Sequence, residues 1–319
     1  MSNLTPRINR LDRNYLLNSA KDFTQRSNTA ENLTGSYEFV TLDRHAYKTA
    51  GSFNGTPTVQ RVQDSPDGKT KYCSEIIADF ADASAELFEA QPIESINARD
   101  LVGENVSFSI YVKSGSCTTL ELRLYTADVE DDFTAVTSIH TASKTIVADG
   151  NWQRVVFENI ALAGNIERGL LVETVLTDSD STGASESHRM TRGKLNIGTT
   201  AQDWNYFSND YAEEKRSCER FYRTLESMAM SADNTVGVEG YYQFPEMRAI
   251  PTLSVSAALV IEDPSVTTYT QSSPAINSAV LTNRAGKFIL NNFSGLTVAR
   301  PYFLTTQGGV IELDSEVAI

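Results

Sequence analysis

The sequence predicts a mainly β protein: a jelly-roll β-sandwich, a short linking helix and a second, small domain like a β-sandwich. Two observations favour this class. Short segments in which apolar and polar residues alternate recur along most of the chain, as in half-buried antiparallel strands. Glycine, proline, aspartate, asparagine and serine separate them, at spacings typical of a two-sheet sandwich. Strands do not alternate with helices, which argues against doubly wound folds and TIM barrels.

The predicted jelly roll occupies residues 15–208. Every second side chain from Val106 to Val112 is apolar, so these side chains share one face of a strand. Residues 119–125 repeat the pattern with three leucines, and we expect these two segments to be neighbouring strands. Further predicted strands are residues 56–62, 71–80, 152–160, 169–177 and 193–198.

The linking helix is predicted over residues 209–230. It begins near Asn209 or Asp210, where Asp210 and Glu213 have the spacing of a capping box. Its apolar face at helical spacing comprises Cys218, Phe221, Tyr222, Leu225 and Met228. The aromatic residues of 220–227 also suit a strand, so a helix that ends as early as Arg220 is the alternative.

The C-terminal β domain is predicted over residues 231–319. Its strands are expected within residues 240–244, 251–261, 278–283, 287–293, 298–307 and 310–317, which proline and glycine residues separate. No repeat period is shared with the first β block, so we expect two distinct modules.

The composition limits the partners. The chain has 319 residues and a formal net charge of −14, so its surface should repel phosphate backbones and anionic membranes. No stretch approaches the length of about 20 apolar residues that inserts into a bilayer. We therefore expect neither nucleic acid as a partner nor membrane insertion. The three cysteines lack the spacing of a disulfide framework or a zinc site, so buried free thiols are expected.

The sequence carries no motif for catalysis. His45, His140 and His188 have no second histidine at metal-binding spacing, and neither a nucleophile elbow nor a phosphate-binding glycine loop occurs. We therefore predict that the protein is not an enzyme. A pair of carboxylates for glycoside hydrolysis stays open, because their separation is spatial rather than sequential.

Two acidic segments are the richest in oxygen ligands, which calcium prefers, although neither has the spacing of a known calcium loop. We consider two interpretations of these segments, a bound structural calcium and a solvated loop, and we expect no other cofactor. The acidic residues are Asp128, Glu130, Asp131 and Asp132 in the first segment and Asp178, Asp180 and Glu186 in the second.

Exposed aromatic rings can stack on the apolar faces of sugars. The candidate ligand-binding residues are Trp204, Tyr206, Tyr241 and Tyr242. Because Tyr241 and Tyr242 are adjacent in a predicted strand, we expect one ring to be buried and the other exposed. Trp152 starts a predicted strand and is assigned to the edge of the core.

Residues 1–14 are predicted to be an N-terminal arm. They are polar and carry Arg7, Arg10 and Arg13, a basic cluster on an acidic chain. Docking of these arginines to a partner is one interpretation, and a frayed terminus is the other.

Six segments, in this order, resemble bacteriophage tail-fibre and related virion appendage proteins. They are residues 14–27, 149–160, 193–204, 213–224, 244–256 and 308–319. The resemblance implies a jelly roll like that of carbohydrate-binding modules, then a helix marked by Cys218, Arg220 and Phe221, then a small β domain. The sequence departs from the family pattern at Thr24 and at Asp43-Arg44-His45, where aromatic residues are common.

The resemblance implies a virion structural protein, made in the host cytoplasm, that serves as a tail fibre or tail appendage and contributes to adhesion to host-surface glycans. Its implied partners are other virion proteins, bound through the arm, and further copies of itself as a homotrimer. One alternative is a capsid decoration or head-fibre protein. Another is a free carbohydrate-binding protein.

Overall fold

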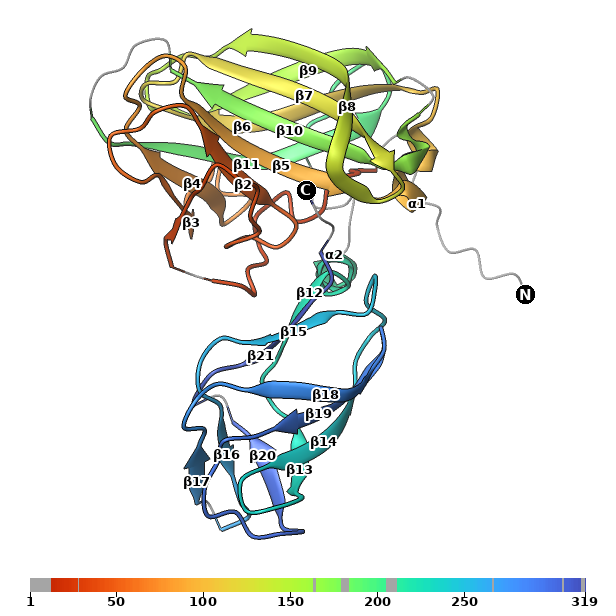
Figure 1. Cartoon of the computed structure of the whole chain (residues 1–319). Coiled ribbons are helices and arrows are strands. Elements are labelled where there is room, and N and C mark those ends of the chain that lie inside the picture. The colour runs from red at the N-terminus through yellow and green to blue at the C-terminus, as the bar shows by residue number, and fades with distance from the viewer. Residues whose placement is uncertain are drawn as a thin grey trace. The chain divides into compact units, whose positions relative to one another are not determined.

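The computed structural model of the chain describes residues 13–27, 29–162, 165–178, 184–204, 211–265, 267–305, 307–316 and 319. It divides into two compact units, one of residues Met1–Lys215 with Val317–Ile319 and the other of residues Arg216–Glu316. Both units are built mainly of antiparallel strands (Figure 1), which confirms the predicted fold class.

The first unit contains two sheets in which all neighbouring strands are antiparallel. The six-stranded sheet has the order β1 (Glu31–Asn32), β3 (Thr58–Val62), β4 (Cys73–Ala78), β11 (Glu186–Ile197), β6 (Asn105–Lys113) and β9 (Gln153–Ala161). The five-stranded sheet has the order β2 (Ala46–Ala50), β5 (Glu86–Ile93), β10 (Leu170–Thr177), β7 (Thr119–Val129) and β8 (Asp132–Thr145). Short helical turns occur at α1 (Ser95–Ala98), η1 (Arg99–Leu101) and η2 (Ile166–Arg168).

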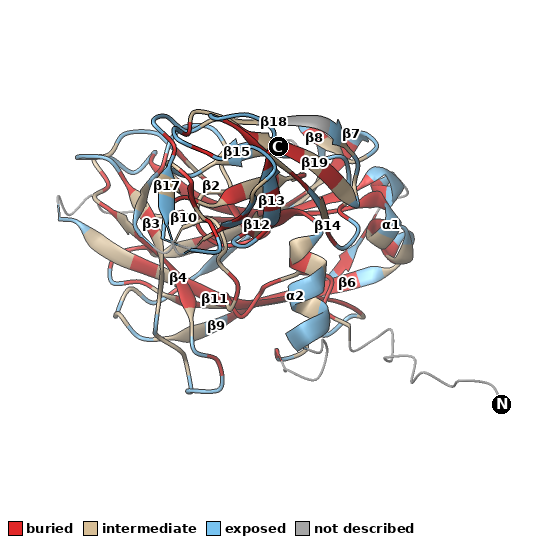
Figure 2. Cartoon of the chain, turned by 90° about the horizontal axis from the view of Figure 1, so that it is seen from below, coloured by how far each residue is buried: buried red, intermediate tan, exposed pale blue. Residues whose placement is uncertain are grey.

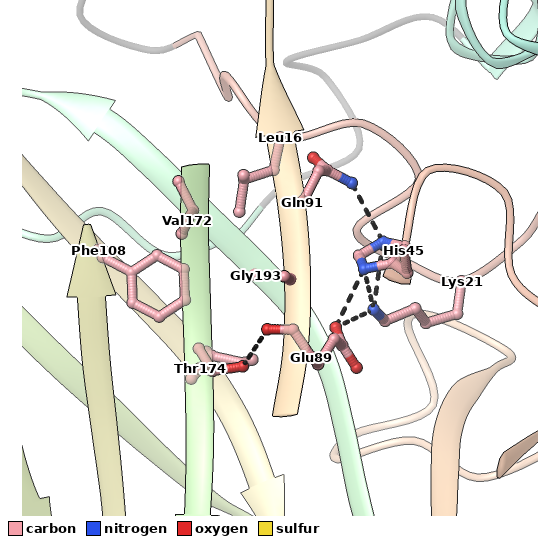
Figure 3. A pocket seen from close by; sticks show the side chains of 11 residues that line it. Leu16, Lys21, His45, Glu89, Gln91, Phe108, Val172, Thr174 and Gly193 are labelled. Atoms are coloured by element: carbon pink, nitrogen blue, oxygen red, sulfur yellow. Dashed lines mark hydrogen bonds and ion pairs between the residues drawn. The ribbon is translucent and has the colours of Figure 1, made fainter. Parts of the chain in front are cut away.

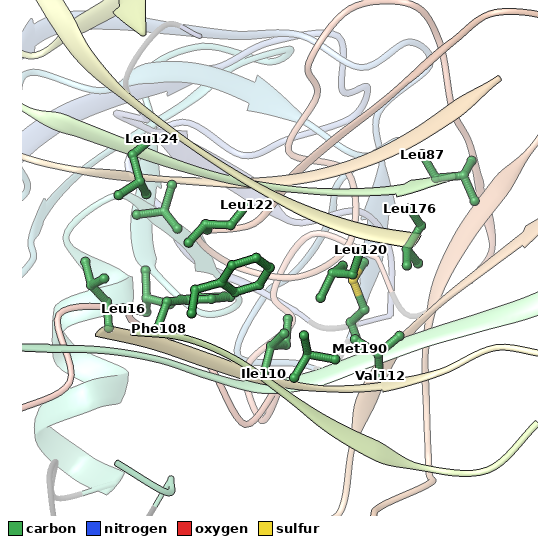
Figure 4. Packing of buried hydrophobic residues seen from close by; sticks show 14 of the residues in the cluster. Leu16, Leu87, Phe108, Ile110, Val112, Leu120, Leu122, Leu124, Leu176 and Met190 are labelled. Atoms are coloured by element: carbon green, nitrogen blue, oxygen red, sulfur yellow. The ribbon is translucent and has the colours of Figure 1, made fainter. Parts of the chain in front are cut away.

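The core of the first unit lies between these sheets. Figure 4 shows the leucines of β7, from Leu120 to Leu124, facing Phe108, Ile110 and Val112 of β6 across the core. The prediction that β6 and β7 are neighbouring strands is therefore wrong, because they belong to opposite sheets. Alternation fixes which side chains of a strand are buried, but two strands that share a core can lie side by side or face each other.

The second unit also contains two antiparallel sheets. A three-stranded sheet has the order β12 (Tyr222–Leu225), β21 (Ile311–Asp314) and β15 (Thr252–Val255). A seven-stranded sheet has the order β17 (Thr268–Thr270), β16 (Val260–Glu262), β20 (Pro301–Leu304), β13 (Ala229–Ala232), β14 (Val238–Gln243), β19 (Ala285–Leu290) and β18 (Ile276–Leu281). Buried residues of both sheets, such as Leu313 and Phe288, form one core.

The linking helix α2 (Tyr211–Glu219) is shorter than predicted. The chain instead forms β12 and β13 over most of residues 222–232, in agreement with the alternative of an early helix end. Tyr222 and Leu225 are buried, but as strand residues that pair with β21. The tertiary pairing thus overrides the helical spacing of the apolar residues. Asp210, the predicted cap, lies outside the described residues.

Glycines permit a close approach of two loops in the second unit. The backbone amide of Gly309 donates a hydrogen bond to the carbonyl oxygen of Ala258 at 2.9 Å. A Cβ atom on Gly309 would lie 2.3 Å from the carbonyl oxygen of Ala257. Residues 256–259 separate β15 from β16, which divides the predicted strand 251–261 into two.

Most strands of both units contain buried residues (Figure 2). Cys73, Cys117 and Cys218 are all buried free thiols, as predicted. Within the described parts of the chain, no helix has the length and apolar character needed to cross a membrane.

Candidate functional site

The outer face of the five-stranded sheet combines aromatic rings with paired charges. The registers place Phe88 beside Lys48 on one side and Val175 on the other, and place Glu173 opposite Arg123. The alternate residues of the same strands, such as Leu87 and Leu122, face the core. We call this surface the Arg123 face and define it by Tyr37, Lys48, Glu86, Phe88, Glu121, Arg123, Tyr125 and Glu173.

Arg123 on β7 is bound by three carboxylates. Its guanidinium donates to Glu86 Oε1 at 2.8 Å, to Glu121 through Nε, and to Glu173 Oε1 at 3.5 Å. Burial alone would lower the pKa of Arg123, but the hydrogen bonds to Glu121 and Glu86 raise it. The side chains of Arg123, Glu86 and Glu121 keep about a fifth to a quarter of their surface exposed, so the cluster is accessible from solvent.

Two tyrosines complete the polar network. The hydroxyl groups of Tyr37 and Tyr125 both donate to the carboxylate of Glu173, Tyr125 at 3.3 Å. Burial, and then the charge of Glu173, raise the pKa of both phenols, so both stay protonated donors. The ring of Tyr37 meets that of Phe88 edge-on, and Lys48 Nζ lies 4.2 Å from the centroid of Tyr37. Both tyrosine rings are half-buried, whereas Phe88 is fully buried.

One end of the Arg123 face is apolar. Ala90, Ala127, Phe133 and Leu171 form a small buried cluster there. Tyr37, Tyr125, Val136 and Ile319 pack partly exposed against it. The polar groups are thus confined to the other end, and the tyrosines lie where the two ends meet.

The interior holds a second polar cluster, around a cavity of about 20 Å³ between the sheets (Figure 3). Lys21 Nζ contacts Glu89 Oε1 and lies 2.8 Å from His45 Nδ1, and Ser74 Oγ donates to Glu89 Oε2 at 2.8 Å. Leu16 and Phe108 close the apolar side of the cavity. It has room for one water molecule but for no larger ligand.

Charge is retained in this interior cluster. Burial alone would raise the pKa of Glu89, but the adjacent Lys21 and His45 hold it well below its usual value. Burial lowers the pKa of Lys21 and of His45. Because all three side chains are buried, we assign the cluster to the structure of the core.

The other two histidines occupy ordinary strand positions. His188 on β11 is buried, with Nδ1 3.0 Å from Ser114 Oγ, and burial lowers its pKa to about 4. His140 lies on β8 and is half-buried. Neither belongs to the Arg123 face.

The structure separates the predicted ligand-binding residues. Trp204 is buried in the first unit, and its indole nitrogen donates to Ser19 Oγ at 3.2 Å, so its ring is no surface platform. Tyr241 and Tyr242 belong to the second unit, where Tyr241 is 74% exposed and Tyr242 packs partly against the core, as their alternation predicts. Tyr206 lies outside the described residues.

Trp152 is half-buried at the start of β9. Its indole nitrogen donates to Asp64 Oδ1 at 3.3 Å. This position agrees with the predicted edge of the core.

The described part of the predicted arm is held by its own unit. The guanidinium of Arg13 donates to Asp100 at 3.2 Å and to Asn97 at 2.9 Å. Arg7 and Arg10 lie outside the described residues. The docking prediction therefore depends on these two arginines.

The first acidic segment forms the β7–β8 hairpin, where its carboxylates have local partners. Asp131 accepts the backbone N–H of Ser95 at 2.6 Å, and Glu130 pairs with Arg99 at 2.7 Å. Of the second segment, Asp180 lies outside the described residues. Among the residues that the structure describes, no three histidine, cysteine or acidic side chains are grouped so that they could hold a metal ion.

The sequence pattern does not predict the cluster of side chains on the Arg123 face. The alternation in residues 119–125 implies that Glu121, Arg123 and Tyr125 point away from the core. Their partners come from β5 and β10, which are distant in sequence, and the pattern does not indicate strand order.

No protein-family model matches the chain, and no curated protein sequence matches it. Solved structures with a similar fold include the enzymatically active domain of tailspike protein 4 from bacteriophage CBA120, with a TM-score of 0.37 and 11% identity over 58% of this chain. Our chain covers 21% of that tailspike chain.

Two further similar structures are sugar-related. A putative sugar binding protein from Bacteroides thetaiotaomicron has a TM-score of 0.40 and 12% identity over 58% of this chain and 100% of its own. The CBM22-1 xylan-binding domain of Paenibacillus barcinonensis Xyn10C has a TM-score of 0.34 and 12% identity over 59% of this chain and 96% of its own.

Proposed function

We propose that this chain is a glycan-binding structural protein, without enzymatic activity, and that the Arg123 face is its binding surface. The observation that carries the proposal is the arrangement around Glu173: an arginine and two tyrosine hydroxyls meet on one carboxylate, beside half-buried aromatic rings. Sugars present apolar ring faces and a dense set of hydroxyl groups. The tyrosine rings supply contact area for the former, and the carboxylates and guanidinium supply acceptors and donors for the latter.

The charges on this face favour a neutral glycan. Glu86, Glu121 and Glu173 outnumber the two cations Arg123 and Lys48 by one charge. The guanidinium already binds carboxylates, and Lys48 lies over the rings of Tyr37 and Phe88. An acidic sugar would meet net repulsion on this face.

A glycan array followed by calorimetric titration tests this function. We expect the full chain to bind neutral bacterial-surface saccharides, and Arg123→Ala to weaken the affinity at least tenfold. Tyr125→Phe removes one hydroxyl and should weaken it less. Arg154→Ala is the matched control, because Arg154 forms an ion pair with Asp203 on the other sheet. Equal binding by Arg123→Ala and wild type, with both folded, contradicts the proposal.

The order of the six motifs supports a place on a bacteriophage particle. We propose a tail fibre or tail appendage that contributes to host adhesion, assembles as a homotrimer and docks to other virion proteins through Arg7 and Arg10. Nucleic acid and membrane insertion have no part in this function, since the chain is strongly acidic.

Electron microscopy of purified virions, labelled with an antibody against residues 216–319, tests the location. Label on the tail supports the proposal. Label over the head supports a capsid decoration protein instead, and particles without label support a free carbohydrate-binding protein.

A further inference from the structure

The seven-stranded sheet of the second unit carries exposed apolar side chains in one row. Phe303 on β20 pairs with Ala229 on β13, Tyr241 on β14 pairs with Lys287 on β19, and Lys287 pairs with Val280 on β18. Strand β13 lies between β20 and β14, and its register with β14 continues to place Ala229 opposite Tyr241. We call these five residues the Tyr241 row.

The row faces solvent. Tyr241 is 74% exposed, Val280 60% and Phe303 48%. The residues that alternate with them in the same strands, such as Met230 and Tyr302, belong to the buried core. Three large exposed apolar side chains thus lie on one face of this sheet, with Ala229 and Lys287 between them, and exposed apolar groups that share a face mark sites of interaction.

The patch has no net charge on a chain whose net charge is −14. Lys287 Nζ lies 2.6 Å from Glu239 Oε2, so these two neutralise each other, and the ammonium lies 5.7 Å from the centroid of the Tyr241 ring. Glu262, which pairs with Phe303, marks the end of the patch at β16. The chain as a whole is acidic, so two copies repel each other at long range, whereas this locally neutral surface lets two copies approach without like charges meeting.

We propose that the Tyr241 row is an interface between copies of this chain. Aromatic residues at the centre and few charges are the composition of protein–protein interfaces, and the repulsion between acidic chains favours contact at a neutral surface. The proposal deepens the homo-oligomer named under Proposed function and rests on that self-association, but not on glycan binding. Each copy contributes the same row, so two or three copies can meet around one axis.

Sedimentation velocity of the full chain, over a hundredfold range of concentration, tests the interface. We expect wild type to sediment as an oligomer, and Tyr241→Glu and Phe303→Glu to shift it to the monomer. Ile250→Glu is the matched control, since Ile250 is 64% exposed in the same unit but outside the row, and it should leave the oligomer intact. Circular dichroism verifies that each variant is folded.

Salt gives a second readout. Because an apolar contact joins two acidic chains, added salt should screen the repulsion and strengthen association. A wild type that stays monomeric at all concentrations overturns the interface, and so do Tyr241→Glu and Phe303→Glu variants that stay oligomeric. If wild type is monomeric and Tyr241→Glu abolishes glycan binding, the row is a sugar platform instead. If Arg123→Ala is the only variant that loses glycan binding, the result concerns the proposed function and does not contradict the interface.

Discussion

Arg123 and Glu173 lie opposite each other on the neighbouring strands β7 and β10, with their charged groups 3.5 Å apart on the outer face of the sheet. Glu173 is almost fully buried and accepts from two tyrosines as well, so it fixes the orientation of the whole cluster. Side chains from β5, β7 and β10 and from the segment around Tyr37 meet at these two residues.

Replacement of this carboxylate by an amide should weaken the cluster. In Glu173→Gln the hydroxyls of Tyr37 and Tyr125 lose a charged acceptor, and Arg123 loses one counter-ion. We expect the free energy of unfolding to fall by about 1.5–3 kcal/mol, the range for hydrogen bonds to charged groups. Glu130→Gln alters an exposed ion pair and should change it by less than about 1 kcal/mol. Urea titrations measure both, and equal effects would contradict the central position of Glu173.

The interior pair of Lys21 and Glu89 should couple strongly. Lys21→Met leaves Glu89 buried without its cation and should cost about 3–5 kcal/mol, whereas the double variant Lys21→Met/Glu89→Leu should recover most of that loss. The two tryptophans, Trp152 and Trp204, both lie in the first unit, so their fluorescence reports its unfolding. Additive losses in the double variant would show that the pair is not coupled.

His188 should make the first unit less stable in acid. Its pKa of about 4 in the folded state lies below the ordinary histidine pKa of 6.5. Between these values the unfolded chain binds more protons, so stability rises with pH across that window and is lost on acidification. The contribution is at most about 3 kcal/mol.

We expect His188→Gln to flatten the pH dependence of the unfolding free energy between pH 7 and 4.5, a range that covers most of that window. His140→Gln, at a half-buried position, serves as the control. An unchanged slope in His188→Gln would assign the acid sensitivity to other groups.

Gly309→Ala should destabilise the second unit. The added methyl group would lie 2.3 Å from the carbonyl oxygen of Ala257, so the two loops must separate. We expect a loss of about 1–3 kcal/mol in calorimetric unfolding of that unit. Gly35→Ala is the control, because the nearest atom to its added methyl group is 3.9 Å away. A Gly309→Ala protein with wild-type stability would mean that the two loops can separate without loss of unfolding free energy.

The sequence contains much of the strand pattern but little of the strand order. The alternation from Val106 to Val112 predicts a strand, and these residues lie in β6, because alternation reports burial directly. The placement of β6 and β7 in opposite sheets depends on the topology of the whole unit.

The side-chain pairs that the sequence pattern does not predict join residues that lie far apart in the chain. Lys21 and Glu89 are 68 residues apart, and Arg123 and Glu173 are 50 apart, so no local pattern connects them. Trp204 illustrates a different limit: its residue type makes it a candidate ligand-binding residue, but its ring is buried and its indole nitrogen donates to Ser19 Oγ. Residue type alone does not distinguish a buried tryptophan from an exposed one.

The buried ion pair of Lys21 and Glu89 also favours the native register of β5 during folding. Successive side chains of β5 face opposite sides, so a slip by one residue would turn Glu89 outward and bring Phe88 or Ala90 toward the core. The ammonium of Lys21 would then be trapped among apolar groups without a counter-ion, at a cost of several kcal/mol. An apolar pair at the same positions would not add this electrostatic cost to the slip, so the ion pair increases the discrimination of the native register of β5 from its nearest competitors.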